Sequence, residues 1–153
     1  MKYVILCDVR SSHNVGAIFR TADGAGVAKI FLCGYTPAPL DRFGRVVGEI
    51  TKTSLGAAQN VSWEQTDDAC GVVRGLQTAG VTVVAIEQTP KAVPLFNYAP
   101  PENVAYIFGN EITGVPAAVL ALVDAVVEIP MHGQKESLNV SSTVAIVLFQ
   151  RPV

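Results

Sequence analysis

The sequence predicts an α/β fold, a mainly parallel sheet with helices on both faces. Three observations predict it. Short apolar runs suited to buried strands alternate with segments whose apolar residues recur at helical spacing. Three of the polar segments next to these runs carry glycine, as turns between parallel strands and helices often do. The length of 153 residues is that of one domain, so we expect residues 1–153 to form a single domain without an RNA-binding extension.

The first half of the chain predicts two strands and three helices. Residues 3–9 are an apolar run suited to a buried strand. Residues 15–25 predict a helix, because at 3.6 residues per turn Val15 and Ile18 share one face while Arg20 points to the opposite side. The next expected elements are a strand at 29–34, a loop at 35–48 and helices at 49–58 and 66–79.

The second half predicts three more strands and two helices. The apolar runs at 81–86, 104–108 and 125–129 are typical of buried strands. Residues 116–123 predict a short helix with proline in its first turn. The last helix begins at Val140 and is apolar nearly all round. A helix of that kind is buried, and we expect it in a subunit interface.

The composition supports self-association. Hydrophobic residues make up 50% of the chain and charged residues only 16%, below the usual quarter. We therefore expect a homodimer that hides part of the surface. No apolar run approaches the roughly 20 residues of a membrane span. We expect no secretory leader, because the first strand begins within a few residues of Met1. We expect a cytoplasmic protein without a membrane segment.

Cysteine and histidine do not predict a metal site. Cys7 and Cys33 lie in apolar strand-like runs, and neither they nor Cys70 form a CxxC pair. We expect all three to be reduced core residues. His13 and His132 are far apart in sequence, and no local spacing supplies them with acidic partners. We expect no bound metal.

Three polar, glycine-marked segments are the candidate ligand site. They span residues 7–27, 104–116 and 131–141. In parallel sheets ligands gather beyond the carboxyl ends of the strands, so we expect the three segments to form one composite site. The net charge of −2 argues against a general nucleic-acid coat, but a local basic patch is compatible with it. The basic residues in or near these turns are Arg10, Arg20, Arg42, Arg45, Lys52 and Lys135.

Each conspicuous residue of these turns also has a purely structural interpretation. Asn14 would serve equally well as a helix N-cap. Arg20 would pair with Asp23 one turn along the same helix. The glycines at 109, 114 and 133 would serve only the turns themselves. The functional interpretation is favoured because all of these residues fall on one rim of the predicted sheet.

The three segments, in this order, resemble the three motifs of the SpoU/TrmH branch of the SPOUT methyltransferases. Residues 14–22 are similar to the first motif, residues 109–111 with Gly114 to the second, and residues 129–141 to the third. Residues 52–57 also resemble the family segment that follows the first motif. Members transfer a methyl group from S-adenosylmethionine to ribose 2′-hydroxyls of RNA.

The resemblance implies a C-terminal trefoil knot and a dimer whose active sites use residues from both subunits. The implied cofactor is S-adenosyl-L-methionine. The residues expected to bind it are Thr89, Gly109, Ile129, Met131, Ser137 and Leu138. The residues expected to take part in the chemistry are Asn14, Arg20, Glu111, Ser137 and Asn139. The residues expected to contact RNA are Arg10, Arg42, Arg45 and Lys52.

The resulting hypothesis is an RNA ribose 2′-O-methyltransferase, with tRNA favoured over rRNA because of the compact chain. Two alternatives share the fold, namely a SPOUT base methyltransferase and a catalytically silent RNA-binding dimer. A nucleotide-binding protein of flavodoxin or Rossmann type is disfavoured, because the turn at residues 8–14 lacks a GxGxxG phosphate loop.

Overall fold

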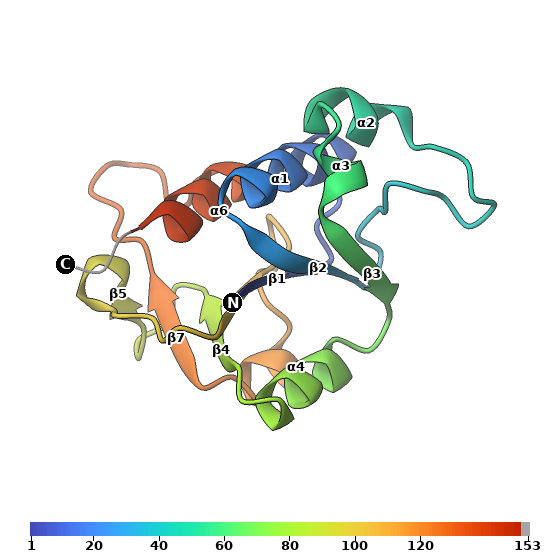
Figure 1. Cartoon of the computed structure of the whole chain (residues 1–153). Coiled ribbons are helices and arrows are strands. Elements are labelled where there is room, and N and C mark those ends of the chain that lie inside the picture. The colour runs from blue at the N-terminus through green and yellow to red at the C-terminus, as the bar shows by residue number, and fades with distance from the viewer. Residues whose placement is uncertain (151–153) are drawn as a thin grey trace.

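A seven-stranded parallel sheet forms the centre of the computed structural model, which describes residues 1–150 (Figure 1). The order across the sheet is β3-β2-β1-β6-β4-β7-β5, and every strand pair is parallel. The parallel sheet expected from the sequence is therefore confirmed. The strands are β1 (Lys2–Cys7), β2 (Val27–Cys33), β3 (Ser62–Thr66), β4 (Thr82–Ile86), β5 (Val93–Pro94), β6 (Val104–Phe108) and β7 (Ala125–Glu128).

Helices cover both faces of the sheet. Helices α1, α2, α3 and α6 lie on one face, and α4 lies with α5 on the other (Figure 1). The helices are α1 (Ser12–Gly24), α2 (Gly48–Ser54), α3 (Ala57–Asn60), α4 (Ala69–Thr78), α5 (Ala117–Leu120) and α6 (Val140–Phe149), with a 3₁₀ turn η1 (Leu95–Asn97).

The central strands β1, β6 and β4 are mostly apolar because both of their faces are buried. Val4 and Leu6 of β1 pack in the cluster formed with α1 and α6. Ile5 and Cys7 point the other way and pack in the cluster formed with α4 and α5. This division follows from the alternation of side chains along a strand. One sheet therefore supports two hydrophobic layers.

Helix α1 begins one turn earlier than its apolar pattern predicts. Ser11 is the N-cap, and its Oγ accepts a hydrogen bond from the backbone N–H of Asn14 at 3.1 Å. Asn14 is therefore inside the first turn, and the suggestion that it caps the helix is wrong. The rest of the pattern is confirmed, since Val15 and Ile18 are buried and Arg20 is exposed.

The helix expected at residues 49–58 is broken in the middle. Leu55 has φ 50° and Gly56 has φ 89°, both in the left-handed region. This region is unfavourable for residues with a Cβ, so Leu55 is an unusual helix terminus. The break separates α2 from α3 and leaves the Leu55 side chain exposed.

The helix expected at residues 66–79 begins later in the structure, at Ala69. Residues 62–66 form the edge strand β3, which pairs with β2. Its side chains are mostly polar and exposed, so it has none of the apolar alternation that identifies a strand. Asp68 caps α4 by accepting from the N–H of Gly71. The two-residue strand β5 was also not expected.

The helix expected at 116–123 is shorter in the structure, where Pro116 precedes it as the N-cap instead of lying in its first turn.

Cys7 and Cys33 are register neighbours on β1 and β2 and are buried free thiols, whereas Cys70 is half-buried. The contact with Cys33 and burial raise the pKa of Cys7, which keeps this thiol protonated. Within residues 1–150, no helix has the length and apolarity that a bilayer crossing requires.

Candidate active site

A cavity of about 560 Å³ lies at the carboxyl ends of β4, β6 and β7. The loops that follow these three strands form its walls, together with the first turns of α6. Its volume is in the range of roughly 300–1,000 Å³ that small-molecule sites occupy. The predicted site residues that line it are Thr89, Gly109, Glu111, Ile129, Met131, Ser137 and Leu138.

The first cavity is lined by both acidic and apolar residues, and we call it the acidic cavity. Its carboxylates belong to Glu87, Glu111, Glu128 and Glu136, and among the described residues that line it there is no lysine, arginine or histidine. Such a lining favours a cationic ligand and disfavours a phosphate. The apolar lining residues are Ile86, Phe108, Ile112, Val115, Leu120, Ile129, Met131, Leu138 and Val140.

A tight turn after β6 forms one wall of the first cavity. Asn110 and Gly114 exchange two backbone hydrogen bonds of 3.1 and 2.9 Å, and Asn110 Oδ1 accepts from the N–H groups of Ile112 and Thr113. Gly114 has φ 72°, which favours glycine. Gly109 faces the turn so closely that a Cβ there would lie 2.2 Å from the carbonyl carbon of Gly114.

Glu87 holds this turn from the neighbouring strand. Its Oε2 accepts a hydrogen bond from the buried backbone N–H of Val115 at 2.9 Å. The next residue, Gln88, donates from Nε2 to the carbonyl oxygen of Glu136 at 2.6 Å. The loop after β4 therefore connects the second and third motifs. Sequence reasoning missed Glu87, because a single glutamate at a strand end has no distinctive local pattern.

Glu87→Ala is expected to destabilise the protein by about 1–3 kcal/mol, because the buried N–H of Val115 loses its acceptor. Glu87→Gln keeps a carbonyl oxygen at this position and is expected to recover most of the loss. Thermal unfolding without ligand measures both, with Ala at the exposed Glu102 as control. An Ala variant that melts with the parent would contradict this role.

A second cavity, of about 640 Å³, lies between α1, α2 and the end of α6. Its basic side chains belong to His13, Arg20 and Lys52, and no described lining residue is acidic, so we call it the basic cavity. The two helices that form it approach closely at Gly16, where a Cβ would lie 2.9 Å from the carbonyl oxygen of Ile50. The first motif and the segment at 52–57 therefore meet here, as one basic surface.

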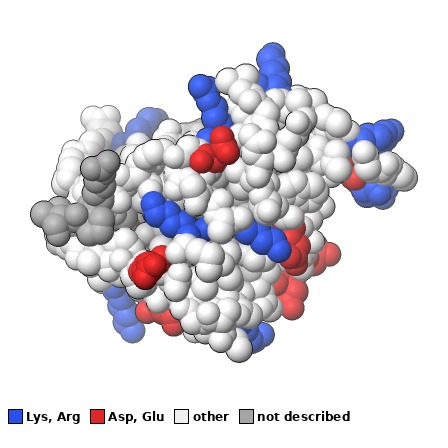
Figure 2. All heavy atoms as spheres, in the orientation of Figure 1, with Lys and Arg blue, Asp and Glu red and all other residues white. Residues whose placement is uncertain are grey.

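The other residues expected to contact RNA lie outside both cavities. Arg10 follows β1 and is exposed. Arg42 and Arg45 belong to the loop between β2 and α2, which projects from the body of the molecule. Basic side chains gather at this projection, on the right of the view in Figure 2. The four residues thus form no single patch, and only Lys52 lies beside Arg20.

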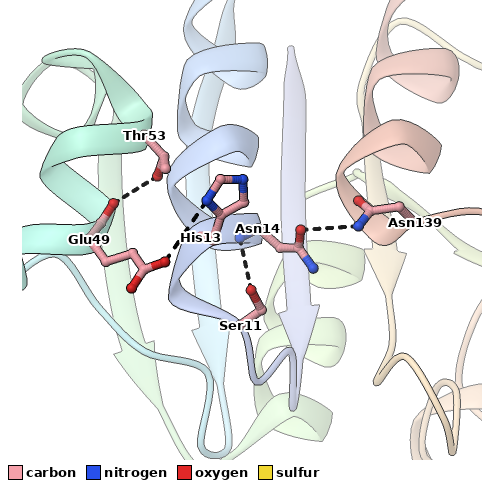
Figure 3. A network of polar contacts seen from close by, with 6 residues as sticks. All are labelled: Ser11, His13, Asn14, Glu49, Thr53 and Asn139. Atoms are coloured by element: carbon pink, nitrogen blue, oxygen red, sulfur yellow. Dashed lines mark hydrogen bonds and ion pairs between the residues drawn. The ribbon is translucent and has the colours of Figure 1, made fainter.

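A hydrogen bond joins the first and third motifs (Figure 3). Asn139 Nδ2 donates to Asn14 Oδ1 at 3.2 Å, and Asn14 is buried. Asn139 is also the N-cap of α6, since its Oδ1 accepts from the N–H of Ser141 at 2.9 Å. This contact fixes the start of α6 against the start of α1.

Within one chain the three turns are in contact, as expected, since Asn110 Nδ2 donates to the carbonyl oxygen of Asp8 at 2.9 Å and Asn139 bonds Asn14. Arg20, however, does not line the cavity that the second and third turns form. The second and third turns line the first, acidic cavity, whereas Arg20 lines the second, basic cavity. Helix α6 borders both cavities, with Thr143 at the first and Phe149 at the second, about 9 Å apart along its axis. Among residues 1–150, Arg20 makes no ion pair with Asp23 or Glu111.

Histidine forms no metal cluster in the part of the chain that the structure describes. No group of three or more His, Cys, Asp or Glu side chains within residues 1–150 is arranged to hold an ion. His13 Nδ1 lies 3.9 Å from a carboxylate oxygen of Glu49, and both side chains are exposed (Figure 3).

Comparison with known proteins gives consistent matches over nearly the whole chain. Residues 1–149 match the model of the SpoU rRNA Methylase family. The 23S rRNA (guanosine-2′-O-)-methyltransferase RlmB of Neisseria meningitidis is 30% identical over 145 residues, which are 95% of this chain and 55% of that protein. The tRNA (guanosine(18)-2′-O)-methyltransferase of Thermus thermophilus is 33% identical over 149 residues, 96% of this chain and 72% of that protein.

Comparison with solved structures also gives methyltransferases. The crystal structure of an AdoMet-bound rRNA methyltransferase from Sinorhizobium meliloti matches with a TM-score of 0.86 and 30% sequence identity, covering 97% of this chain and 54% of that one. The chain thus spans about half the length of the Neisseria and Sinorhizobium proteins it matches.

Proposed function

The chain belongs to the SpoU rRNA methylase family, and from this premise we propose that it transfers a methyl group from S-adenosylmethionine to a ribose 2′-hydroxyl of RNA. One observation carries the proposal beyond the family match. The two cavities differ in the sign of their ionisable residues, since the first is lined by glutamates and the second by His13, Arg20 and Lys52. A cationic cofactor and an anionic RNA would each find a complementary surface.

The first cavity fits S-adenosylmethionine in size and in chemistry. Its glutamates would attract the positive sulfonium and amino groups, and its apolar lining residues would pack against an adenine ring. When bound, the cofactor would supply an electrophilic methyl carbon. We expect Ile129, Met131 and Leu138 to form the apolar wall, and Thr89, Gly109 and Ser137 to complete the cofactor site.

Arg20 is the proposed catalytic residue on the RNA side. A guanidinium is a poor base, so Arg20 would not remove the 2′-hydroxyl proton itself. It would stabilise the negative charge that develops on the 2′-oxygen, in the manner of an oxyanion-hole donor. The proton would pass to solvent or to a phosphate oxygen of the RNA.

The other proposed site residues position Arg20 and the ribose. Asn14 and Asn139 are held together by their hydrogen bond and would orient the ribose with Ser137. Glu111 lines the acidic cavity and is exposed, so its carboxylate is available to a guanidinium. A charge-assisted hydrogen bond between Glu111 and Arg20 would hold Arg20 near the reacting oxygen.

We propose that this pairing forms between two subunits of a homodimer. A two-fold dimer would bring the basic cavity of one subunit to the acidic cavity of the other. The position of exposed apolar side chains supports this arrangement, since Leu55 and Phe149 line the basic cavity and Phe149 of α6 is 58% exposed. The expected interface role of the last helix stays a prediction on which this proposal depends.

We also propose the C-terminal trefoil knot of the family. Two features support it. Strand β4 lies between β6 and β7 in the sheet, so the chain does not add its last strands in sequence order. The end of the chain then returns to earlier segments, because Gln150 Nε2 donates to the carbonyl oxygen of Leu95 at 2.6 Å and Lys2 Nζ donates to that of Leu148.

Transfer of labelled methyl from S-adenosylmethionine to separate tRNA and rRNA fractions, followed by digestion to nucleosides, tests the function. We expect a 2′-O-methylated nucleoside, and the fraction that carries the label identifies the RNA class. A base-methylated nucleoside would assign the chain to a base methyltransferase instead. RNA and cofactor binding without transfer to either fraction would favour the silent RNA-binding dimer.

A further inference from the structure

The loop between β2 and α2 ends in a small closed turn with an aromatic residue at its tip. Leu40 and Val46 form an antiparallel bridge at the base of the turn. Above it, the N–H of Asp41 donates to the carbonyl oxygen of Arg45 at 2.8 Å. Gly44 has φ 74°, which lets the chain reverse next to Phe43. The turn projects from the body of the molecule (Figures 1 and 2).

Asp41 organises this turn from inside. Its Oδ1 accepts from the N–H groups of Phe43 and Arg45 at 2.8 and 3.0 Å, and its Oδ2 pairs with Arg45 Nε at 2.9 Å. The hydrogen bond from the Arg45 backbone is the main cause that lowers the pKa of Asp41, so this carboxylate is ionised at neutral pH. Arg45 is therefore held and largely neutralised by Asp41.

Phe43 is 65% exposed although two guanidinium groups lie over its ring. The Cζ atoms of Arg42 and Arg45 are 4.7 and 4.9 Å from the ring centroid. The two arginines differ, because Arg45 is fixed by Asp41 whereas Arg42 has no ion-pair partner among residues 1–150. The Arg42 side chain is therefore free to turn away from the Phe43 ring and bind an RNA phosphate. That movement would expose more of the ring.

We propose that Phe43 stacks on an unpaired RNA base while Arg42 contacts an adjacent phosphate. The proposal depends on the proposed function and names a contact of its substrate. Unpaired bases commonly stack on aromatic and guanidinium groups of proteins, and the stack tolerates any base. The charge of the tip favours RNA over a protein partner, since two arginines and one aspartate leave it net positive. Arg45 then serves as a scaffold.

Binding of a short single-stranded RNA of mixed sequence, and of a duplex of the same length, tests the proposal. Phe43→Ala is expected to weaken single-strand binding about tenfold without changing the salt dependence, and to leave duplex binding unchanged. Phe43→Tyr keeps a ring and is expected to bind like the parent. Arg42→Ala is expected to lower the slope of log affinity against log salt by about one. Phe96, 64% exposed in η1, provides the Ala control.

Several outcomes would overturn the stacking contact. One is single-strand binding by Phe43→Ala as tight as that of Phe96→Ala, and another is an equal loss on the duplex. A change in molecular mass by light scattering for Phe43→Ala would assign the tip to a protein interface instead. Methyl transfer by the parent to tRNA or rRNA, measured on the same preparation, separates this failure from failure of the proposed function. A parent without transfer would overturn the proposed function, and the binding of Phe43→Ala to single-stranded RNA would still decide the stacking contact.

Discussion

Replacing Arg20 with alanine is expected to lower methyl transfer by about 100- to 1,000-fold, the effect of removing one oxyanion donor. The affinity for S-adenosylmethionine is expected to stay within about twofold of the parent, since Arg20 is not among the residues proposed to hold the cofactor. The reason is geometric, because Arg20 lines the basic cavity and the cofactor would occupy the acidic one. Turnover falls while cofactor binding does not.

Single-turnover methyl transfer and calorimetric titration with S-adenosylmethionine measure the two quantities for Arg20→Ala. Arg74→Ala is the matched control, because Arg74 is an exposed helical arginine on α4, on the opposite face of the sheet. Arg20→Lys keeps the charge but loses the planar fork, so an intermediate rate is expected. Near-parent turnover of Arg20→Ala would discard the electrostatic role.

Gly109→Ala is expected to distort the wall of the acidic cavity. The added Cβ would lie 2.2 Å from the carbonyl carbon of Gly114 and 2.3 Å from the backbone nitrogen of Val115. Both atoms are backbone and cannot rotate away, so the turn has to move into or away from the cavity. We expect a stability loss of about 1–3 kcal/mol from overpacking. Displacement of the wall is expected to weaken cofactor affinity at least about tenfold, equivalent to about 1.4 kcal/mol.

Gly133→Ala provides the control for this change. Gly133 lies in the loop of the third motif, and an added Cβ there would meet no atom within 4 Å. Calorimetry and thermal unfolding of the two variants separate a local clash from a general effect of losing glycine. Unchanged cofactor affinity in Gly109→Ala would mean that the turn after β6 does not form the cofactor site.

The sequence predicts those elements best whose neighbours bury them completely. Strand β6 coincides with the expected run at residues 104–108, because a strand covered on both faces is apolar throughout. The edge strand β3 was missed for the opposite reason, since polar, mostly exposed side chains have no strand signal. The break at Leu55 was missed because the left-handed backbone of a leucine leaves no trace in composition.

The sequence brought residues of the second and third motifs to one predicted site, and Gly109, Ile129 and Leu138 do line one cavity. Their binding of the cofactor stays a prediction. Glu87 was not predictable, because its partner Val115 is distant in sequence and only the pairing of β4 with β6 brings the two together. The separation of Arg20 from the cavity was also beyond the sequence, since it depends on how α1 and α6 cross the sheet.

Arg20 and the acidic cavity, separate within one chain, are brought together by a second copy in our account. Co-expression of differently tagged Arg20→Ala and Gly109→Ala chains tests this claim most directly, with the 2′-O-methylated nucleoside as readout. Below saturating cofactor, Arg20→Ala alone is expected to be nearly inactive, and Gly109→Ala alone to keep about a tenth of the parent rate or less. A mixed population is expected to recover roughly a quarter of the parent activity. About half of the dimers would be heterodimers, and each of these keeps one of its two sites intact. Purified heterodimers that fold, bind RNA and form no 2′-O-methylated product would contradict the account.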